Sequence, residues 1–207
     1  MKIFIKAILA GIAISTGGVV YLTLENHIIG SFLFTIGLFM IFTFNLELYT
    51  GKVCYIPNKE LGYLKDVLLA LAGNTVGTVS MGYLLRHTRV SKVVNHTVDI
   101  VNGKLSDTIF SSFVMAVFCG MMMCVAVIGY RTIKEGIIKY MALVVPIMVF
   151  ILSGFEHSIA NMFFYSIADA WGVKAVAYIV VIAIGNLIGG ALIPLAVWYL
   201  DGVKLGC

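Results

Sequence analysis

A short polar stretch interrupts one of the most apolar parts of the chain. The sequence "GFEHSIAN", residues 154–161, places Glu156, His157 and Asn161 between long apolar runs. Histidine ordinarily titrates at about pH 6.5 and can exchange a proton near neutrality, and an asparagine amide can donate hydrogen bonds. Ionisable groups are costly inside a membrane and are functional candidates for that reason. We predict that Glu156 supports an interrupted backbone and that His157 faces a solute path. A buried structural histidine is the alternative.

A second interruption, "NLELYTG" at residues 45–51, has the same character. Gly51 and Gly154 allow the backbone to bend, and Thr50 can bond backbone groups that a bend leaves free. Irregular backbone at membrane depth must be buried in protein or line a cavity. We therefore predict two broken helices, with Glu47 supporting this one. An ordinary helix end before a polar loop is the alternative at residues 45–51.

The composition indicates a membrane protein. Of the 207 residues, 61% are hydrophobic and only 12% are charged, whereas soluble domains carry about 25% charged residues. The apolar start, "MKIFIKAILAGIAIS", is followed at once by more apolar segments, so it is interpreted as a first spanning helix rather than a signal peptide. The formal net charge of +4 is spread over loops, and we expect no nucleic-acid partner.

Six stretches are long and apolar enough to span a bilayer, which takes about 20 residues each. The polar segment 87–107 separates the third from the fourth and could carry a short surface helix. We predict an all-α membrane protein with one domain over residues 1–207. The six predicted spans are residues 7–24, 28–45, 67–85, 109–129, 140–168 and 173–200.

The two halves of the chain resemble each other. "GNTVG" at residues 73–77 recurs as "GNLIG" at 185–189, an offset of 112, and Glu47 recurs as Glu156, an offset of 109. Three crossings per half would make the second copy enter the membrane upside down. We predict a 3+3 inverted repeat with halves of about 1–86 and 108–207, in which the second and fifth helices are interrupted.

Basic residues predict the orientation. With a cytoplasmic N-terminus and six crossings, nine Lys and Arg residues fall inside and five outside. Cytoplasmic segments carry an excess of such residues. We therefore expect a multi-pass protein of the cell's inner membrane with both termini in the cytoplasm.

The sequence gives no sign of an enzyme, a metal centre or a cofactor. The four cysteines form no CxxC pair, and there is no HExxH motif. The other histidines, His27, His87 and His96, are expected in loops. Glu47, Glu156 and His157 could in principle hold a metal, but no second histidine falls in a predicted span.

Four stretches together resemble the formate/nitrite transporter family. They are "NLELYTG", "FCGMMMCVAV" at residues 118–127, "GFEHSIAN" followed by "MFF", and "GNLIGGAL". The resemblance implies an aquaporin-like fold, one pore per protomer, assembly as a homopentamer in the lipid bilayer, and passage of small monovalent anions or their weak acids. Hydrosulfide, nitrite and formate are the expected substrates, with hydrosulfide favoured because the chain is short.

The resemblance also implies roles for individual residues. The central pore would hold His157, Thr50 and Asn161; the cytoplasmic constriction Leu48, Tyr49 and Met123; the external constriction Phe34, Leu38 and Phe150; and the outer vestibule Lys104. The chain departs from the family at Gly120, where the family often has Asn. This departure would remove a pore-side hydrogen-bond donor and widen the cavity.

Between two apolar constrictions, a bare anion is poorly solvated. We expect the anion to take a proton, from water or from His157, and to cross as the neutral acid. A proton-coupled carrier of the same anions is one alternative. An aquaporin-like channel for neutral solutes is another, although the sequence has no paired NPA motifs.

Overall fold

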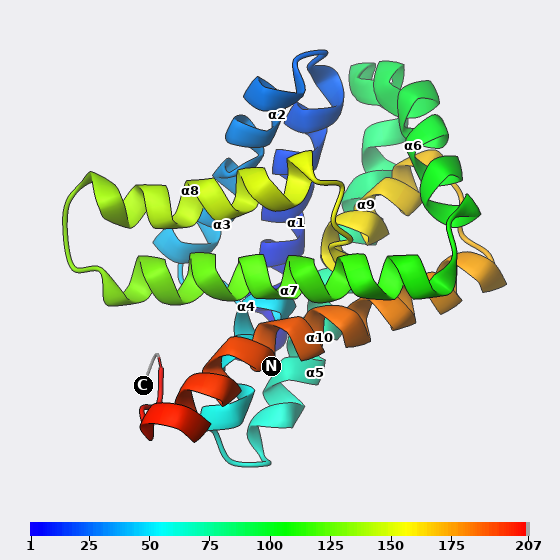
Figure 1. Cartoon of the computed structure of the whole chain (residues 1–207). Coiled ribbons are helices and arrows are strands. Elements are labelled where there is room, and N and C mark those ends of the chain that lie inside the picture. Colours follow the sequence, from blue (N-terminus) through cyan, green and yellow to red (C-terminus); the bar gives the residue numbers. More distant parts are fainter. Residues whose placement is uncertain (206–207) are drawn as a thin grey trace.

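The computed structural model describes residues 1–205, except for the side chain of Ser91. Throughout this part of the chain the regular elements are helices (Figure 1). The elements are α1 (Lys2–Thr23), α2 (His27–Phe34), α3 (Ile36–Thr43), α4 (Tyr49–Lys52), η1 (Val53–Asn58), α5 (Tyr63–Arg86), η2 (Arg89–Val93), α6 (Val94–Ser106), α7 (Ile109–Thr132), α8 (Ile137–Leu152), α9 (Ser158–Ala168) and α10 (Val173–Asp201).

Within the described residues, four helices are long and apolar enough to cross a membrane: α1, α5, α7 and α10. The other two predicted spans consist of shorter apolar helices. The second is divided into α2 and α3 at Thr35, and the fifth into α8 and α9. The predicted all-α membrane fold is confirmed, and the polar stretches at residues 45–51 and 154–161 do fall at helix breaks.

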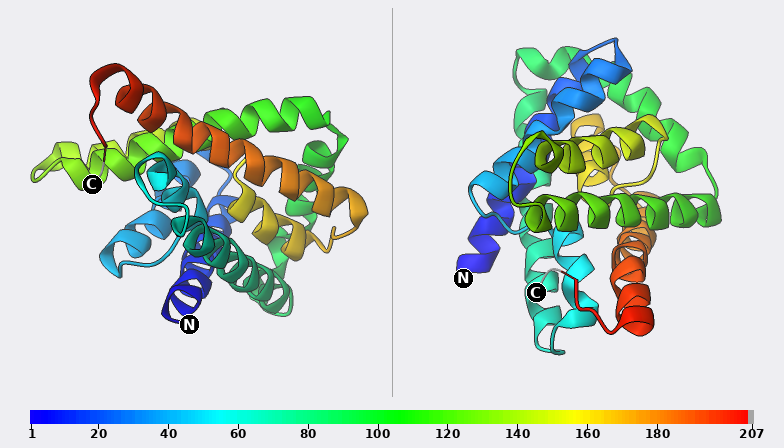
Figure 2. Two further views of the ribbon diagram at one scale, coloured as in Figure 1. Left: turned by 90° about the horizontal axis from the view of Figure 1, so that it is seen from below. Right: turned by 60° about the vertical axis from the view of Figure 1, so that its left-hand side comes forward.

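The long helices cross in two closely packed pairs, α1 with α5 and α7 with α10. Figure 2 shows these crossings from two further directions. The crossings are close because small residues lie in them. A Cβ atom on Gly77 would meet the Ile8 carbonyl oxygen, and one on Gly189 would meet the Val117 carbonyl oxygen. Such contacts between small residues and backbone are typical of helix association in membranes.

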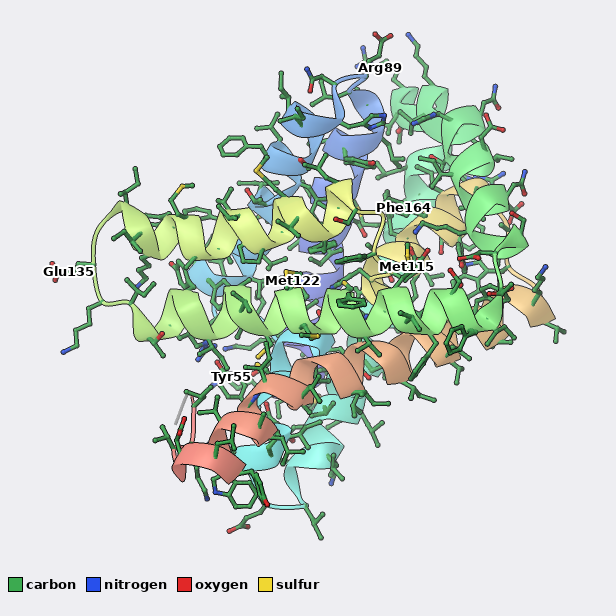
Figure 3. All side chains as sticks on the ribbon, in the orientation of Figure 1. Tyr55, Arg89, Met115, Met122, Glu135 and Phe164 are labelled. Carbon is green, nitrogen blue, oxygen red and sulfur yellow. The ribbon has the colours of Figure 1, made fainter. Side chains whose placement is uncertain are left out.

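The α9 helix lies at the centre of the molecule. Residues 158–167 are all buried, and α9 packs against α5, α6, α1 and α10. In Figure 3 the labelled Phe164 lies near this centre, whereas Glu135 lies at the far tip of the α7–α8 hairpin. The half-helix that follows the "GFEH" interruption is therefore surrounded by protein.

The polar segment 87–107 does carry helices. It forms η2 and α6, and α6 packs across α9. Thr97 and Val101 supply its buried face, each with no exposed side-chain area. This segment therefore covers one end of the central helix instead of forming an open loop.

Candidate functional site

Two non-helical segments meet near the centre of the fold. Residues 44–48 separate α3 from α4, and residues 153–157 separate α8 from α9. Asn45 and Gly154 have φ angles of 49° and 69°, in the left-handed region that ends a helix. Each break leaves backbone N–H and C=O groups without helical partners, and these groups need other partners when they are buried.

Two buried asparagines, Asn74 and Asn186, supply those partners. The Asn74 side chain accepts a hydrogen bond from the Tyr49 N–H at 2.8 Å and donates to the Glu47 and Ala7 carbonyls at 2.9 and 2.7 Å. Asn186 holds the second break in the same way.

The Asn186 contacts repeat those of Asn74 one for one. Its side chain accepts from the Ser158 N–H at 2.9 Å and donates to the Glu156 and Ala116 carbonyls at 2.8 and 2.9 Å. The partners of the two asparagines are related by the offset of 109, and the asparagines themselves by 112. These contacts agree with the predicted repeat. The motif match pointed to these asparagines, but their bracing role was missed because their partners are backbone groups that only the breaks expose.

Each break also carries a carboxylate paired with a lysine. Glu47 Oε2 lies 2.8 Å from Lys52 Nζ. Glu156 Oε2 lies 2.8 Å from Lys104 Nζ and accepts a second hydrogen bond, at 2.5 Å, from Asn161. Glu156 is buried, so its charge is stabilised by these two donors. Lys104, which the resemblance assigns to the outer vestibule, is therefore an ion-pair partner of Glu156.

His157 is the N-cap of α9, and both of its ring nitrogens are hydrogen-bonded. Nδ1 accepts the Ala160 N–H at 3.1 Å, and Nε2 lies 2.9 Å from Thr50 Oγ1. A neutral imidazole carries one N–H, and an Nδ1 atom that accepts cannot be the one that carries it. The proton therefore resides on Nε2, which donates to Thr50. The Thr50 hydroxyl proton is then free for another acceptor.

Two phenylalanines lie next to this histidine. The Phe150 ring stacks on the His157 ring at 5.6 Å, with an interplanar angle of 18°. Phe34 meets Phe150 edge-on at 6.2 Å. All three side chains are almost fully buried. The pair Phe34 and Phe150 thus forms an apolar layer against the imidazole.

A cavity of 210 Å³, here called the Lys104 cavity, adjoins these three rings. The predicted residues Phe34, Phe150, His157, Asn161 and Lys104 all line it. His27 and His96 line it as well. Sequence reasoning missed these two because it assigned both to loops, whereas they belong to α2 and α6.

A second cavity, of 280 Å³, is here called the Lys52 cavity. It is lined by the predicted Leu48 and by basic and aromatic residues that were not singled out. These additional residues are Lys52, Lys59, Arg131, Tyr55, Tyr63 and Phe42. The Arg131 guanidinium lies 5.8 Å from the rings of both Phe42 and Tyr55.

The cavity linings place three of the predicted constriction residues apart from the others. Leu38 lines the Lys52 cavity with Leu48, not the Lys104 cavity with Phe34 and Phe150. Leu38 follows Phe34 by four positions, or about 6 Å along a helix, enough to place the two side chains on different cavities. Tyr49 and Met123 line neither cavity. Both are buried, and the Tyr49 hydroxyl donates to the Ala183 carbonyl at 2.9 Å.

Gly120 is not a pore position. A Cβ atom there would meet the Asn186 carbonyl oxygen and lie 2.8 Å from the Gly190 nitrogen, both in α10. The expectation that Gly120 removes a pore-side donor and widens the cavity is therefore wrong. Its Cα belongs to the α7–α10 crossing, as that of Gly11 belongs to the α1–α5 crossing.

A metal site is not formed by the residues that the structure describes: no three His, Cys, Asp or Glu side chains gather closely enough to bind an ion. Cys54, Cys119 and Cys124 are buried free thiols, and Cys207 lies outside the described residues. The polar groups gathered at the two breaks are His157, the Thr50 hydroxyl, the asparagine amides and two lysine–carboxylate pairs.

Long apolar helices, two braced breaks and two cavities, one of them lined by His157, are features of a multi-pass membrane protein that conducts or transports a solute. The model of the formate/nitrite transporter family matches residues 1–200, and the chain belongs to this family. The protein is therefore an anion channel or transporter and not an enzyme.

Curated relatives are similar over most of the chain. Formate channel FocB of Escherichia coli (strain K12) is 24% identical over 93% of this chain and 84% of its own length. A formate-nitrite transporter of Plasmodium knowlesi (strain H) is 27% identical over 93% of this chain and 74% of its own length. A solved structure, described as a "Pentameric formate channel with formate bound", has the same fold, with a TM-score of 0.82 and 23% identity over 96% of this chain and 95% of that one.

Proposed function

We propose that the protein passes small monovalent anions or their weak acids, namely formate, nitrite or hydrosulfide, between the Lys104 and Lys52 cavities. The observation that carries this proposal is the Thr50–His157 hydrogen bond, which joins the two breaks at 2.9 Å. Phe34 and Phe150 adjoin it on the Lys104 side, and Leu38 and Leu48 line the Lys52 cavity. A solute that passes between the cavities meets few polar groups except this pair.

The apolar residues determine which chemical form crosses. An anion loses much of its hydration between Phe34, Phe150, Leu38 and Leu48, at a cost of several kcal/mol. The neutral acid loses much less. The falling dielectric also raises the proton affinity of the anion. We therefore propose that the solute is protonated near His157 and crosses the constrictions as the acid.

The His157 hydrogen bonds support water as the proton source. His157 could donate a proton to an anion and remain neutral only if it began as the imidazolium. That form would place a proton on Nδ1 and break the hydrogen bond from Ala160 that caps α9. The neutral ring with its Nε2–H retains the cap. In this role His157 orients the Thr50 hydroxyl, which can donate a hydrogen bond to the solute. Asn161 lines the Lys104 cavity together with His157.

The protein's setting is proposed from the sequence and its relatives. We infer six crossings in two inverted halves of about 1–86 and 108–207, with both termini in the cytoplasm of the cell's inner membrane. The likeness to a solved pentameric formate channel supports a homopentamer. In this orientation the Lys104 cavity faces outward and the Lys52 cavity inward.

The test is flux into proteoliposomes with formate, nitrite and hydrosulfide offered in turn. We expect uptake of at least one of them to rise as the external pH falls from 8 to 5, because the acid form becomes more abundant. Uptake that is independent of pH over this range would contradict protonation. Planar bilayers test the charge of the crossing species: the neutral acid carries no current, so a sustained formate, nitrite or hydrosulfide current would contradict crossing as the acid.

A further inference from the structure

Aromatic rings make up much of the wall of the Lys104 cavity. Among the described residues that line it, five carry a phenyl or phenol ring, and they come from α1, α2, α8, α9 and the second break. These five residues are Tyr21, Phe34, Phe150, Phe155 and Phe164. Lys104 contributes a fixed positive charge to the same lining. The cavity therefore combines a broad aromatic surface with a basic group.

The lining changes from exposed to buried with depth. His27, His96 and Gly154 are exposed, so they form a mouth that solution can reach. Phe164 and Phe34 are only 7% and 2% exposed, so they belong to the floor. A molecule that enters from solution thus leaves water and meets aromatic rings.

Phe155 and Phe164 are supported from outside the cavity. The Phe155 ring stacks on the Phe118 ring of α7 at 5.5 Å, with an interplanar angle of 24°. Phe164, labelled in Figure 3, follows His157 by about two turns of α9, so both side chains lie on the helix face that lines the cavity. Its ring lies against α1 at Gly18, where a Cβ atom would be 3.5 Å from Phe164 Cε1. Neighbouring helices therefore hold both rings in the cavity wall.

The floor of the cavity is closed to a solute the size of a phenyl ring. Phe34 meets Phe150 at 6.2 Å, and Phe150 stacks on His157 at 5.6 Å. Rings with centroids at such separations are in contact, so another ring can pass only if they move far apart. Formate, nitrite and hydrosulfide are much smaller than a ring and need less displacement. Size thus separates solutes that can enter the cavity from solutes that can also cross its floor.

We propose that the Lys104 cavity binds the anions of monocyclic aromatic acids, such as benzoate, which block the pathway without crossing it. The ring packs between Phe155 and Phe164, because aromatic rings pair favourably in stacked or edge-on arrangements and bury apolar surface. The acidic group accepts a hydrogen bond from Lys104 Nζ, which has three N–H donors and gives one of them to Glu156. Formate can reach the same lysine but has no ring to bury.

The block of transport rests on the proposed function, whereas the binding itself does not. Binding and transport are therefore measured separately. The thermal midpoint of the protein purified in detergent is followed against benzoate and against acetate, at neutral pH and constant ionic strength. Acetate carries the same carboxylate without the ring, so the comparison isolates the contribution of the aromatic wall.

Inhibition is measured as formate uptake into right-side-out and inverted membrane vesicles with benzenesulfonate outside. A sulfonate stays ionised and does not cross the bilayer as a neutral acid, so it reports which side of the protein binds the ring. The variants are Phe155→Leu and Phe164→Leu, which keep an apolar side chain but remove the ring. The matched control is Phe39→Leu in α3, because Phe39 is 43% exposed and does not line the cavity.

In the wild type and in Phe39→Leu, benzoate should half-saturate its effect at a concentration about tenfold below that of acetate, a difference of about 1.4 kcal/mol. Phe155→Leu and Phe164→Leu should each weaken benzoate about 3- to 10-fold and leave acetate unchanged. Benzenesulfonate should inhibit formate uptake in right-side-out vesicles and not in inverted ones.

Equal affinities for benzoate and acetate would overturn the inference. So would wild-type benzoate affinity in both leucine variants, or inhibition by benzenesulfonate in inverted vesicles alone. In each of these cases formate uptake by the wild type would leave the proposed function standing. Ring-dependent binding by a protein that takes up none of formate, nitrite and hydrosulfide would support the binding site and overturn the proposed function.

Discussion

The Nε2 atom of His157 lies 2.9 Å from the Thr50 hydroxyl, although 107 residues separate them in the chain. Thr50 lies in α4, directly after the first break, His157 ends the second break, and both side chains are buried. The contact therefore depends on both breaks at once. Because Ala160 occupies Nδ1, the hydrogen bond runs from the imidazole to the hydroxyl.

Removing the Thr50 hydroxyl, which is the acceptor, tests the direction of this hydrogen bond. Thr50→Val keeps the shape of the side chain but leaves the Nε2–H of His157 unpaired in a buried site, which costs about 1–3 kcal/mol. We expect a lower thermal midpoint and at least a tenfold loss of anion uptake in proteoliposomes. Thr50→Ser retains the hydroxyl and should keep most of the uptake. Equal uptake by the valine variant and the wild type would rule out a functional hydroxyl.

Substitutions of His157 separate capping from transport. His157→Phe removes both hydrogen bonds, so we expect almost no anion uptake, and the lost N-cap should cost about 0.5–2 kcal/mol. His157→Asn can still accept the Ala160 N–H but is too short to replace the imidazole at Thr50. It should therefore approach wild-type thermal stability and still lose uptake. Wild-type flux in the phenylalanine variant would remove His157 from the mechanism.

The sequence predicted the two breaks because clustered polar and ionisable residues are rare inside apolar spans. Their repetition at offsets of 109 and 112 also predicted the relation between the halves. It could not predict what Asn74 and Asn186 bond, because their partners are mainly backbone atoms exposed at the breaks. The resemblance grouped Leu38 with Phe34 and Phe150, but a motif match does not give the depth of each side chain, and Leu38 lines the Lys52 cavity.

The histidines of the Lys104 cavity show a second limit. Polarity alone placed His27 and His96 in loops, and both are indeed exposed. Their position on a shared cavity follows from the way α6 packs over α9, which buries Thr97 and Val101. The apolar residues of α6 recur at a helical spacing, at positions 94, 98, 101 and 105, but this pattern predicts only a helix and not the cavity that its polar face lines. Tertiary contacts therefore had to be seen before these residues could be grouped.

Asn74 and Asn186 should contribute about equally to the stability of the fold. Asn186→Leu removes three hydrogen bonds at the second break and leaves the Ser158 N–H and two carbonyls without these partners. At about 1 kcal/mol for each bond, and more where a group stays unsatisfied, a loss of about 3–5 kcal/mol is expected. Asn74→Leu should cost a similar amount. The measurement is the thermal unfolding of each variant purified in detergent. A variant within about 1 kcal/mol of the wild type would contradict the bracing role.

The Lys104–Glu156 pair should show strong coupling. The side chains are 17% and 6% exposed, so removing one partner leaves a poorly solvated charge, at a cost of about 3–5 kcal/mol. We expect Glu156→Gln and Lys104→Met each to lower the thermal midpoint and the double variant to recover part of the loss. A double-mutant cycle measures this coupling. Additive losses would mean that the two charges do not stabilise each other. The Glu47–Lys52 pair provides a comparison with a more exposed carboxylate, because the Glu47 side chain is 24% exposed and that of Lys52 is 13% exposed.

Gly120→Asn tests whether the difference between this chain and the family's common Asn at this position concerns helix packing or the pore. A Cβ atom at Gly120 would overlap the backbone of α10 at Asn186, so neither asparagine nor alanine fits unless α7 and α10 separate. Separation would also pull Asn186 away from the second break. We therefore expect Gly120→Ala and Gly120→Asn to reduce the yield of folded protein severely.

The matched control is Gly103→Ala in α6, where a Cβ atom would have no neighbour within 4 Å. Because alanine favours helix over glycine by about 1 kcal/mol, this control should fold at least as well as the wild type. A well-folded Gly120→Asn protein with altered anion selectivity would restore the pore interpretation.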